Sequence, residues 1–127
     1  MHTVFCYGTL RLGESNHKLM KRARRKEGKF WTIGKLYDTG DGYPALIHSE
    51  ESKVYGEVYE VDDELLKKID VLEGFQEGRD HNLYDRVMKK VSGEKESYDA
   101  ITYVMRNPKE RFIEIPSGDW VKYRQNG

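Results

Sequence analysis

The chain has 127 residues and a formal net charge of zero, with 22 Lys and Arg balanced by 22 Asp and Glu. This balance provides no global attraction to nucleic acid or to an anionic membrane, so neither is expected as a partner. With 37% hydrophobic and 35% charged residues, residues 1–127 are expected to form a single globular domain with a charged surface.

The sequence also indicates a compartment. Cys6 is the single cysteine, so no intrachain disulfide can form, as is typical of a reducing environment. No apolar run approaches the roughly 18 residues needed to cross a bilayer. The first residues lack the basic and then apolar pattern of a signal peptide. We therefore expect a cytoplasmic protein.

The first half of the chain predicts one strand, one helix and three more strands. Residues 3–7 are apolar and β-rich and run into a turn at Gly8, which predicts a strand. Residues 15–27 predict a helix, because capping residues precede a narrow apolar stripe and Gly28 can end it. Further strands are expected over 30–37, 43–47 and 54–61.

The second half predicts a helix over 63–73 and two strands, over 84–91 and 100–105. Four apolar residues at helical spacing are expected to face the core, and Gly74 can stop the helix. They are Leu65, Leu66, Ile69 and Leu72. After Pro108 we expect a short polar helix or turn and a frayed end. Because strands follow one another, the order favours antiparallel pairing. The predicted fold class is therefore α+β, a small, closed or nearly closed, mostly antiparallel β-barrel with flanking helices.

Three stretches could carry chemistry, and the first is Tyr7-Gly8-Thr9-Leu10-Arg11. A glycine after a strand allows close approach of a ligand or a positive φ. Successive amide groups in such a turn can bind an anion. The alternative is an ordinary turn between a strand and a loop.

The second stretch contains Glu73, the last residue before the glycine that stops the helix. Leu72 is expected to point into the core, which places Glu73 beside buried surface. Loss of solvent and the negative end of the helix dipole would both raise its pKa, which suits a general base. The alternative is a Glu that faces solvent at a helix end.

The third stretch is Tyr84-Asp85-Arg86. In a strand, Tyr84 and Arg86 point to the same face. If that face is inward, a phenol and a guanidinium line a pocket, and if it is outward, both are surface side chains.

Together, the Tyr-Gly-Thr-Leu-Arg stretch, an Asp-x-x-Glu-Gly motif ending at Gly74, and Tyr84-x-Arg86 resemble the γ-glutamylcyclotransferase-like (AIG2-like) family, most closely its short bacterial branch. The resemblance spans nearly the whole chain. Further matches are Gly42-Tyr43-Pro44-Ala45, Val54-Tyr55-Gly56-Glu57-Val58-Tyr59, Ala100-Ile101-Thr102-Tyr103-Val104 and Ser117-Gly118-Asp119-Trp120.

The resemblance implies a β-barrel with a cavity and an enzyme, of acyltransferase or lyase type, that cyclises a γ-glutamyl amine to 5-oxoproline and releases the amine. It places the catalytic glutamate at Glu73 and the substrate-binding loop at Tyr7, Gly8, Thr9 and Leu10. Tyr84 and Tyr103 are further candidates for lining the cavity. The loop amides would hold either the α-carboxylate or the oxyanion. The reaction is intramolecular, so neither a protein nucleophile nor a cofactor is required.

Other chemistries have weaker support in the sequence. Cys6 is distant from any His and is expected to be a buried structural thiol. The four His residues lack the spacing of metal ligands, so no metal is expected. The basic residues between 18 and 26 are expected to form a solvated face and not a nucleic-acid site, because no aromatic residues alternate with them.

Two alternatives to a simple cyclotransferase remain at this point. The barrel could be a non-catalytic module that binds a small molecule, since fold does not establish function. It could also remove a γ-glutamyl protecting group from a biosynthetic intermediate. The amine half of the substrate is open: an amino acid, an isopeptide lysine or a small amine. The loop over 75–83 is expected to influence that choice. The sequence leaves the oligomeric state open.

Overall fold

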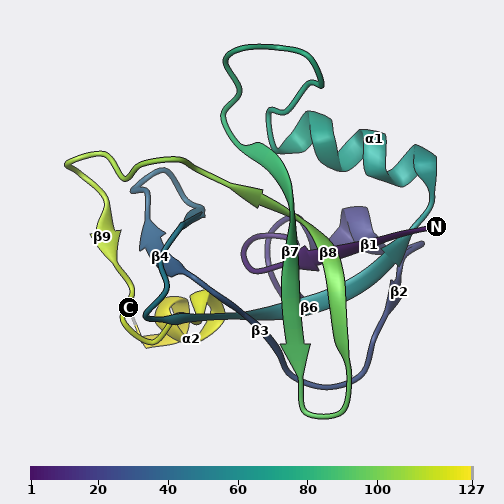
Figure 1. Cartoon of the computed structure of the whole chain (residues 1–127), viewed down its shortest axis with the longest axis horizontal. Helices are drawn as coiled ribbons and strands as arrows, with labels where there is room; N and C mark the ends of the chain where they lie inside the picture. Colours follow the sequence, from purple (N-terminus) through teal and green to yellow (C-terminus); the bar gives the residue numbers. More distant parts are fainter. Residues whose placement is uncertain (127) are drawn as a thin grey trace.

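The computed structural model, which describes residues 1–126, is built on a closed barrel of five strands (Figure 1). Around the barrel the strands pair in the order β1–β8–β7–β3–β6 and back to β1. Their bounds are β1 His2–Cys6, β3 Phe30–Ile33, β6 Lys53–Val61, β7 Asp85–Gly93 and β8 Ser97–Val104. The expected barrel is therefore confirmed, with one parallel pair, β1 and β8, among antiparallel ones.

Alternation along the strands divides the core into two clusters. Phe5 of β1 and Val58 of β6 belong to one cluster, whereas their neighbours Val4 and Tyr59 belong to the other. Because successive side chains of a strand point to opposite faces, the first cluster fills the barrel and the second covers its outside. Helix α1 (Asp63–Leu72) packs on this outer cluster, beside β1 in Figure 1.

A second, three-stranded sheet lies at one end of the barrel. It pairs β4 (Lys35–Asp38) with β5 (Pro44–Ile47) on one side and β9 (Ile113–Glu114) on the other. The amide of Met105 donates to the carbonyl of Leu46 at 3.0 Å, which ties this sheet to the segment after β8. β5 thereby lies next to the end of β1, where the site forms.

The structure corrects the predicted helix over 15–27. Only His17–Met20 form a short 3-10 helix (η1), and Arg24–Arg25 form a strand, β2, on β6. A continuous helix would stack basic side chains three and four residues apart, which is unfavourable. Directly after the strand, the Lys26 ammonium instead pairs with the Glu60 carboxylate at 2.6 Å.

Two further expectations are wrong in detail. The single strand predicted over 30–37 is broken at Gly34, so that β3 belongs to the barrel and β4 to the small sheet. Gly34 turns away to donate its amide to the carbonyl of Ser52 at 2.9 Å. The end expected to fray forms helix α2 (Trp120–Asn126), because Trp120 is buried in the barrel cluster.

Candidate active site

All residues that the sequence assigned to the site line one pocket. The pocket lies between the C-terminal end of α1, the end of β1 and the start of β5. The seven predicted residues that line it are Tyr7, Gly8, Thr9, Leu10, Glu73, Tyr84 and Tyr103. The acidic side chain and the N-terminal loop, although more than sixty residues apart in sequence, therefore face the same hollow.

Glu73 is the C-cap of α1, and the backbone that follows holds it in place. The amide of Phe75 donates to the carbonyl of Asp70 at 2.9 Å, and the amide of Gly74 donates to Val71 at 3.2 Å. These two bonds form a Schellman motif, which requires a left-handed residue at Gly74, where φ is +67°. Glu73 is therefore fixed at the last turn of a well-ended helix.

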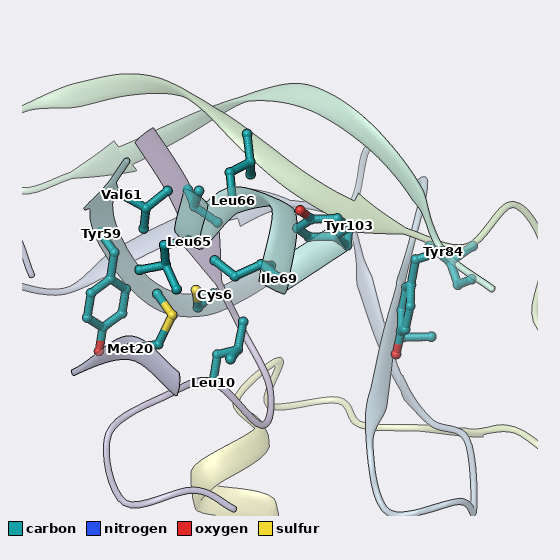
Figure 2. Close-up of a cluster of buried hydrophobic side chains, with 13 residues drawn as sticks. Cys6, Leu10, Met20, Tyr59, Val61, Leu65, Leu66, Ile69, Tyr84 and Tyr103 are labelled. Atoms are coloured by element: carbon teal, nitrogen blue, oxygen red, sulfur yellow. The ribbon is translucent and has the colours of Figure 1, made fainter. Parts of the chain in front are cut away.

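The side chain of Glu73 takes the last position on the core-facing side of α1. It follows Ile69 by four residues and Leu66 by seven, and both of these are buried. Leu72, expected in the core, is 40% exposed because it lies at the opposite edge of the apolar stripe. In Figure 2, Leu65, Leu66 and Ile69 group around Cys6 of β1. This face leads from the apolar cluster into the pocket.

The Glu73 carboxylate has no counter-charge. It makes no hydrogen bond and no ion pair with any residue from 1 to 126. Burial, which penalises the charged form, raises the pKa of Glu73 to about 7. A carboxyl with that pKa is a mixture of acid and base at neutral pH, which is what proton transfer in both directions requires.

The loop opposite Glu73 presents free amide groups. The amides of Gly8, Thr9 and Leu10 donate to no acceptor within the described part of the chain, whereas the carbonyls of the same residues accept bonds from Arg11, Asn16 and His17. Gly8 is required by close packing and not by a positive φ, because a Cβ there would lie 2.8 Å from the ring of Pro44. Three donors thus remain available to negative charge.

Three of the four tyrosines that line the pocket, Tyr7, Tyr84 and Tyr103, are held by hydrogen bonds of their hydroxyl groups. The Tyr7 hydroxyl donates to the Tyr103 carbonyl at 2.7 Å and accepts from the Leu46 amide at 3.1 Å. The Tyr84 hydroxyl donates to the Pro44 carbonyl. Burial raises the pKa of all three phenols, so they stay protonated. They shape the pocket while Glu73 carries the titratable charge.

A charged cluster around Asp70 anchors the end of α1. The Asp70 carboxylate accepts from the Tyr103 hydroxyl at 2.6 Å and from Arg86 Nη1 at 2.7 Å. The Arg86 guanidinium also lies 4.9 Å from the ring centroid of Phe75. Because Asp70 and Phe75 lie on either side of Glu73, these contacts position the Glu73 backbone.

Sequence reasoning missed part of this site. The sequence left open whether the face of Tyr84 and Arg86 points inward, and in the structure Tyr84 lines the pocket whereas Arg86 binds Asp70. Asp70 was recognised only as part of a motif, although its position one turn before Glu73 is a signal that the two act together. Further lining residues are Val4, Phe5, Cys6, Tyr43 and Pro44. Burial raises the pKa of the Cys6 thiol, which agrees with its predicted structural role.

In this barrel, a carboxylate without a partner among the described residues and three free amides line the same pocket. Residues 4–122 match the family described as "Gamma-glutamyl cyclotransferase, AIG2-like". The chain belongs to this family, and it is an enzyme of the γ-glutamylcyclotransferase type. The family resemblance seen in the sequence is thereby confirmed.

Individual relatives agree with this assignment. The chain is 43% identical to the "Gamma-L-glutamyl-butirosin B gamma-glutamyl cyclotransferase" of Niallia circulans, over 98% of this chain and 78% of that protein. Among solved structures, it is similar to an AIG2-like protein of Mus musculus, with a TM-score of 0.73 and 27% identity over 87% of this chain and 80% of that one. A protein of Pyrococcus horikoshii has a TM-score of 0.74 and 29% identity, over 99% of this chain and 95% of that one.

Two negative findings concern the described residues only. No helix within residues 1–126 combines the length and apolarity needed to traverse a bilayer. In the same part of the chain, no three His, Cys, Asp or Glu side chains gather in an arrangement that could hold a metal ion.

The Asp70 cluster yields a first prediction. We expect Arg86→Ala to lower the free energy of unfolding by about 1–3 kcal/mol, because it leaves a largely buried carboxylate with one partner fewer. The side chains of Arg86 and Asp70 are only 23% and 18% exposed. Chemical denaturation measures the change. Lys68→Ala, which removes the exposed ion pair with Glu64 on the same helix, is the control and should cost at most about 0.5 kcal/mol. Equal losses in the two variants would contradict the anchoring role.

Burial of Glu73 yields a second prediction. The unfolded chain loses the Glu73 proton near the ordinary glutamate pKa of 4.5, whereas the folded chain, in which the pKa is about 7, retains it to higher pH. The folded state therefore loses stability as the pH rises between these values. Glu73→Gln has no charge to bury, so its stability relative to the native chain should increase by about 2 kcal/mol from pH 5 to pH 8. Denaturant titrations at both pH values measure this, and a constant difference would show that the carboxylate is not desolvated.

Proposed function

We propose that this enzyme cyclises a γ-glutamyl amine to 5-oxoproline and releases the amine, with Glu73 as the general acid and base. The observation that carries the proposal is the Glu73 carboxylate, which is unpaired, has a pKa near 7 and shares one pocket with the free amides of the 8–10 loop. Family membership supports the cyclotransferase reaction, and the residue roles are our inference from geometry.

The first half of the reaction forms a bond. Glu73 takes a proton from the substrate α-ammonium, and the freed amine nitrogen attacks the γ-carbonyl carbon. A five-membered ring forms, and the former carbonyl oxygen carries negative charge. Because both reacting groups belong to one molecule, holding the glutamyl chain in its folded conformer supplies much of the acceleration. The pocket provides the walls for this through Tyr7, Tyr84 and Tyr103.

The second half breaks a bond. The ring nitrogen of the tetrahedral intermediate gives its second proton to solvent. The intermediate then collapses, the bond from the γ-carbon to the amine nitrogen breaks, and Glu73 returns the proton it holds to that nitrogen. The products are 5-oxoproline and the free amine, with no change in oxidation state. The amides of Gly8, Thr9 and Leu10 offer hydrogen bonds to the negative charge of the substrate, either its α-carboxylate or the developing oxyanion.

One observation favours a particular use of this reaction. The relative from Niallia circulans is named for a γ-L-glutamyl derivative of butirosin B. At 43% identity over 98% of this chain, this relative supports a second candidate, removal of a γ-glutamyl protecting group from an amine-bearing biosynthetic intermediate. The chemistry at Glu73 is the same in both cases, and only the leaving amine differs.

The role of Glu73 is tested by turnover. The native chain incubated with a panel of γ-glutamyl amines should form 5-oxoproline, detected by mass spectrometry. Glu73→Gln should lower kcat by about 10²–10⁴-fold, because general acid–base catalysis contributes that much. It should leave substrate affinity, measured by calorimetry, nearly unchanged. Equal product from the variant would exclude the proposed role, and binding without product from the native chain would indicate a non-catalytic binding barrel.

The pH dependence provides a separate test. Glu73 must be ionised to accept the first proton, so kcat should increase about tenfold per pH unit below the pKa and level off above it. With the pKa at about 7, the profile should bend near neutrality. Arg86→Ala, which disturbs the helix end without removing the base, should lower kcat and still show such a bend. A native profile that is flat from pH 5.5 to 8.5 would rule out Glu73 as the titrating group.

A further inference from the structure

A second cavity adjoins the Glu73 pocket. It has a volume of about 340 Å³ and shares Tyr43 with the pocket as a common wall. The Tyr43 ring packs against Tyr84 with the centroids 6.1 Å apart. Leu83 and Asp85 line the cavity, whereas Tyr84, between them, lines the pocket, so the two hollows lie on opposite sides of this segment. They are therefore neighbouring compartments that share a wall.

We propose that this cavity, between the 76–83 loop and the 105–112 segment, is the subsite for the amine half of the substrate and takes polar amines of metabolite size. It is called the amine subsite below. The inference rests on the proposed function and adds to it the place and the chemical class of the leaving group. A volume of about 340 Å³ lies within the usual range of small-molecule sites, roughly 300–1,000 Å³.

The first wall of the amine subsite is attached directly to the catalytic residue. The amide of Leu83 and Nη2 of Arg79 both donate to the carbonyl of Gly74 at 3.0 Å. Asn82 Oδ1 accepts from the amide of Gln76 and from Nε of Arg79, each at 2.9 Å. The 76–83 loop is thus closed on the residue that follows Glu73. The leaving nitrogen must lie beside Glu73 to receive its proton, so the rest of the amine extends along this loop.

The opposite wall is equally ordered. Arg111 donates through Nη2 to Asp41 Oδ2 at 2.7 Å and through Nε to the carbonyl of Thr39 at 3.2 Å. Arg106 donates to Asp85 at 3.0 Å. These ion pairs cancel most of the charge around the cavity. What remains is a lining of hydrogen-bonding groups, Asn107 among them, above an apolar part that includes Phe112.

This composition selects by hydrogen bonding more than by net charge. A leaving amine with hydroxyl or amide groups can bond to both walls, whereas an alkyl amine of the same length would leave the polar groups unpaired. We therefore assign to the amine subsite a preference for amines that carry several polar groups. The narrow, phenol-lined pocket at Glu73 holds the γ-glutamyl half in every case.

The test uses three γ-glutamyl amides whose leaving groups are methylamine, hexylamine and glucamine, the last two being six-carbon chains that differ only in hydroxyl groups. For the native chain, kcat/KM should be about tenfold higher for the glucamine amide than for the hexylamine amide. Asn107→Trp fills the cavity from an exposed position and should lower kcat/KM for the glucamine amide about tenfold. It should leave the methylamide within about twofold, because methylamine does not enter the amine subsite. Asp80→Trp, from the opposite wall, should have the same effect.

The control is Glu110→Trp, which places the same side chain on an exposed residue of the same segment that does not line the cavity. It should leave all three substrates within about twofold of the native values. Equal losses on the methylamide and the glucamine amide, or no loss on either, in both cavity variants would overturn the location. Preference for the hexylamine amide would overturn the chemical class. If the native chain forms no 5-oxoproline from any of the three, the proposed function fails and the inference with it.

Discussion

The site depends on one unfavourable interaction, the partial burial of a carboxylate without a counter-charge. Removing much of the water around the Glu73 side chain raises its pKa to about 7, and this cost must be offset by the rest of the fold. The apolar row of Leu65, Leu66 and Ile69 packs α1 onto the barrel. The Schellman motif and the Asp70 cluster then hold the helix end, so that the Glu73 backbone keeps a fixed position at the pocket.

The groups near the site are arranged so that Glu73 has no counter-charge. Arg86, which lies close to the end of α1, forms an ion pair with Asp70 and stacks on Phe75. Its charge is therefore compensated by Asp70, and it makes no ion pair with Glu73. The phenols contribute no charge, since burial keeps them protonated. The remaining favourable partners for an anion are the amides of Gly8, Thr9 and Leu10, which donate to no acceptor within residues 1–126. Under the proposed function, the base and the anion-binding groups are therefore separate and can act on the same substrate.

The barrel explains how distant segments meet at this point. The parallel pairing of β1 with β8 sets Val4 opposite Ile101, which brings the end of β1 beside Tyr103. The small sheet then places Pro44 against Gly8, so closely that a side chain on Gly8 would collide with its ring. The pocket is therefore formed where the barrel, the small sheet and helix α1 meet. Such junctions are common places for ligand sites, because each unit contributes a few rigid side chains.

The sequence by itself determined the family, the fold class and the central helix, and the seven residues it proposed for the site line one pocket. Their signals are local: alternation in Val54–Val61, the cap at Asp62, the stop at Gly74, and motifs in a recognisable order. It misjudged residues 15–27, where the helical spacing competed with pairing of residues 24 and 25 along the edge of β6, a contact far away in the sequence. It also misjudged Leu72, because the spacing of apolar residues on α1 does not show which edge of the apolar face packs against the barrel. Only the tertiary structure decided that Arg86 binds Asp70, that the loop amides stay free and that Glu73 lacks a partner. These are contacts between segments far apart in the chain, and no local pattern encodes them.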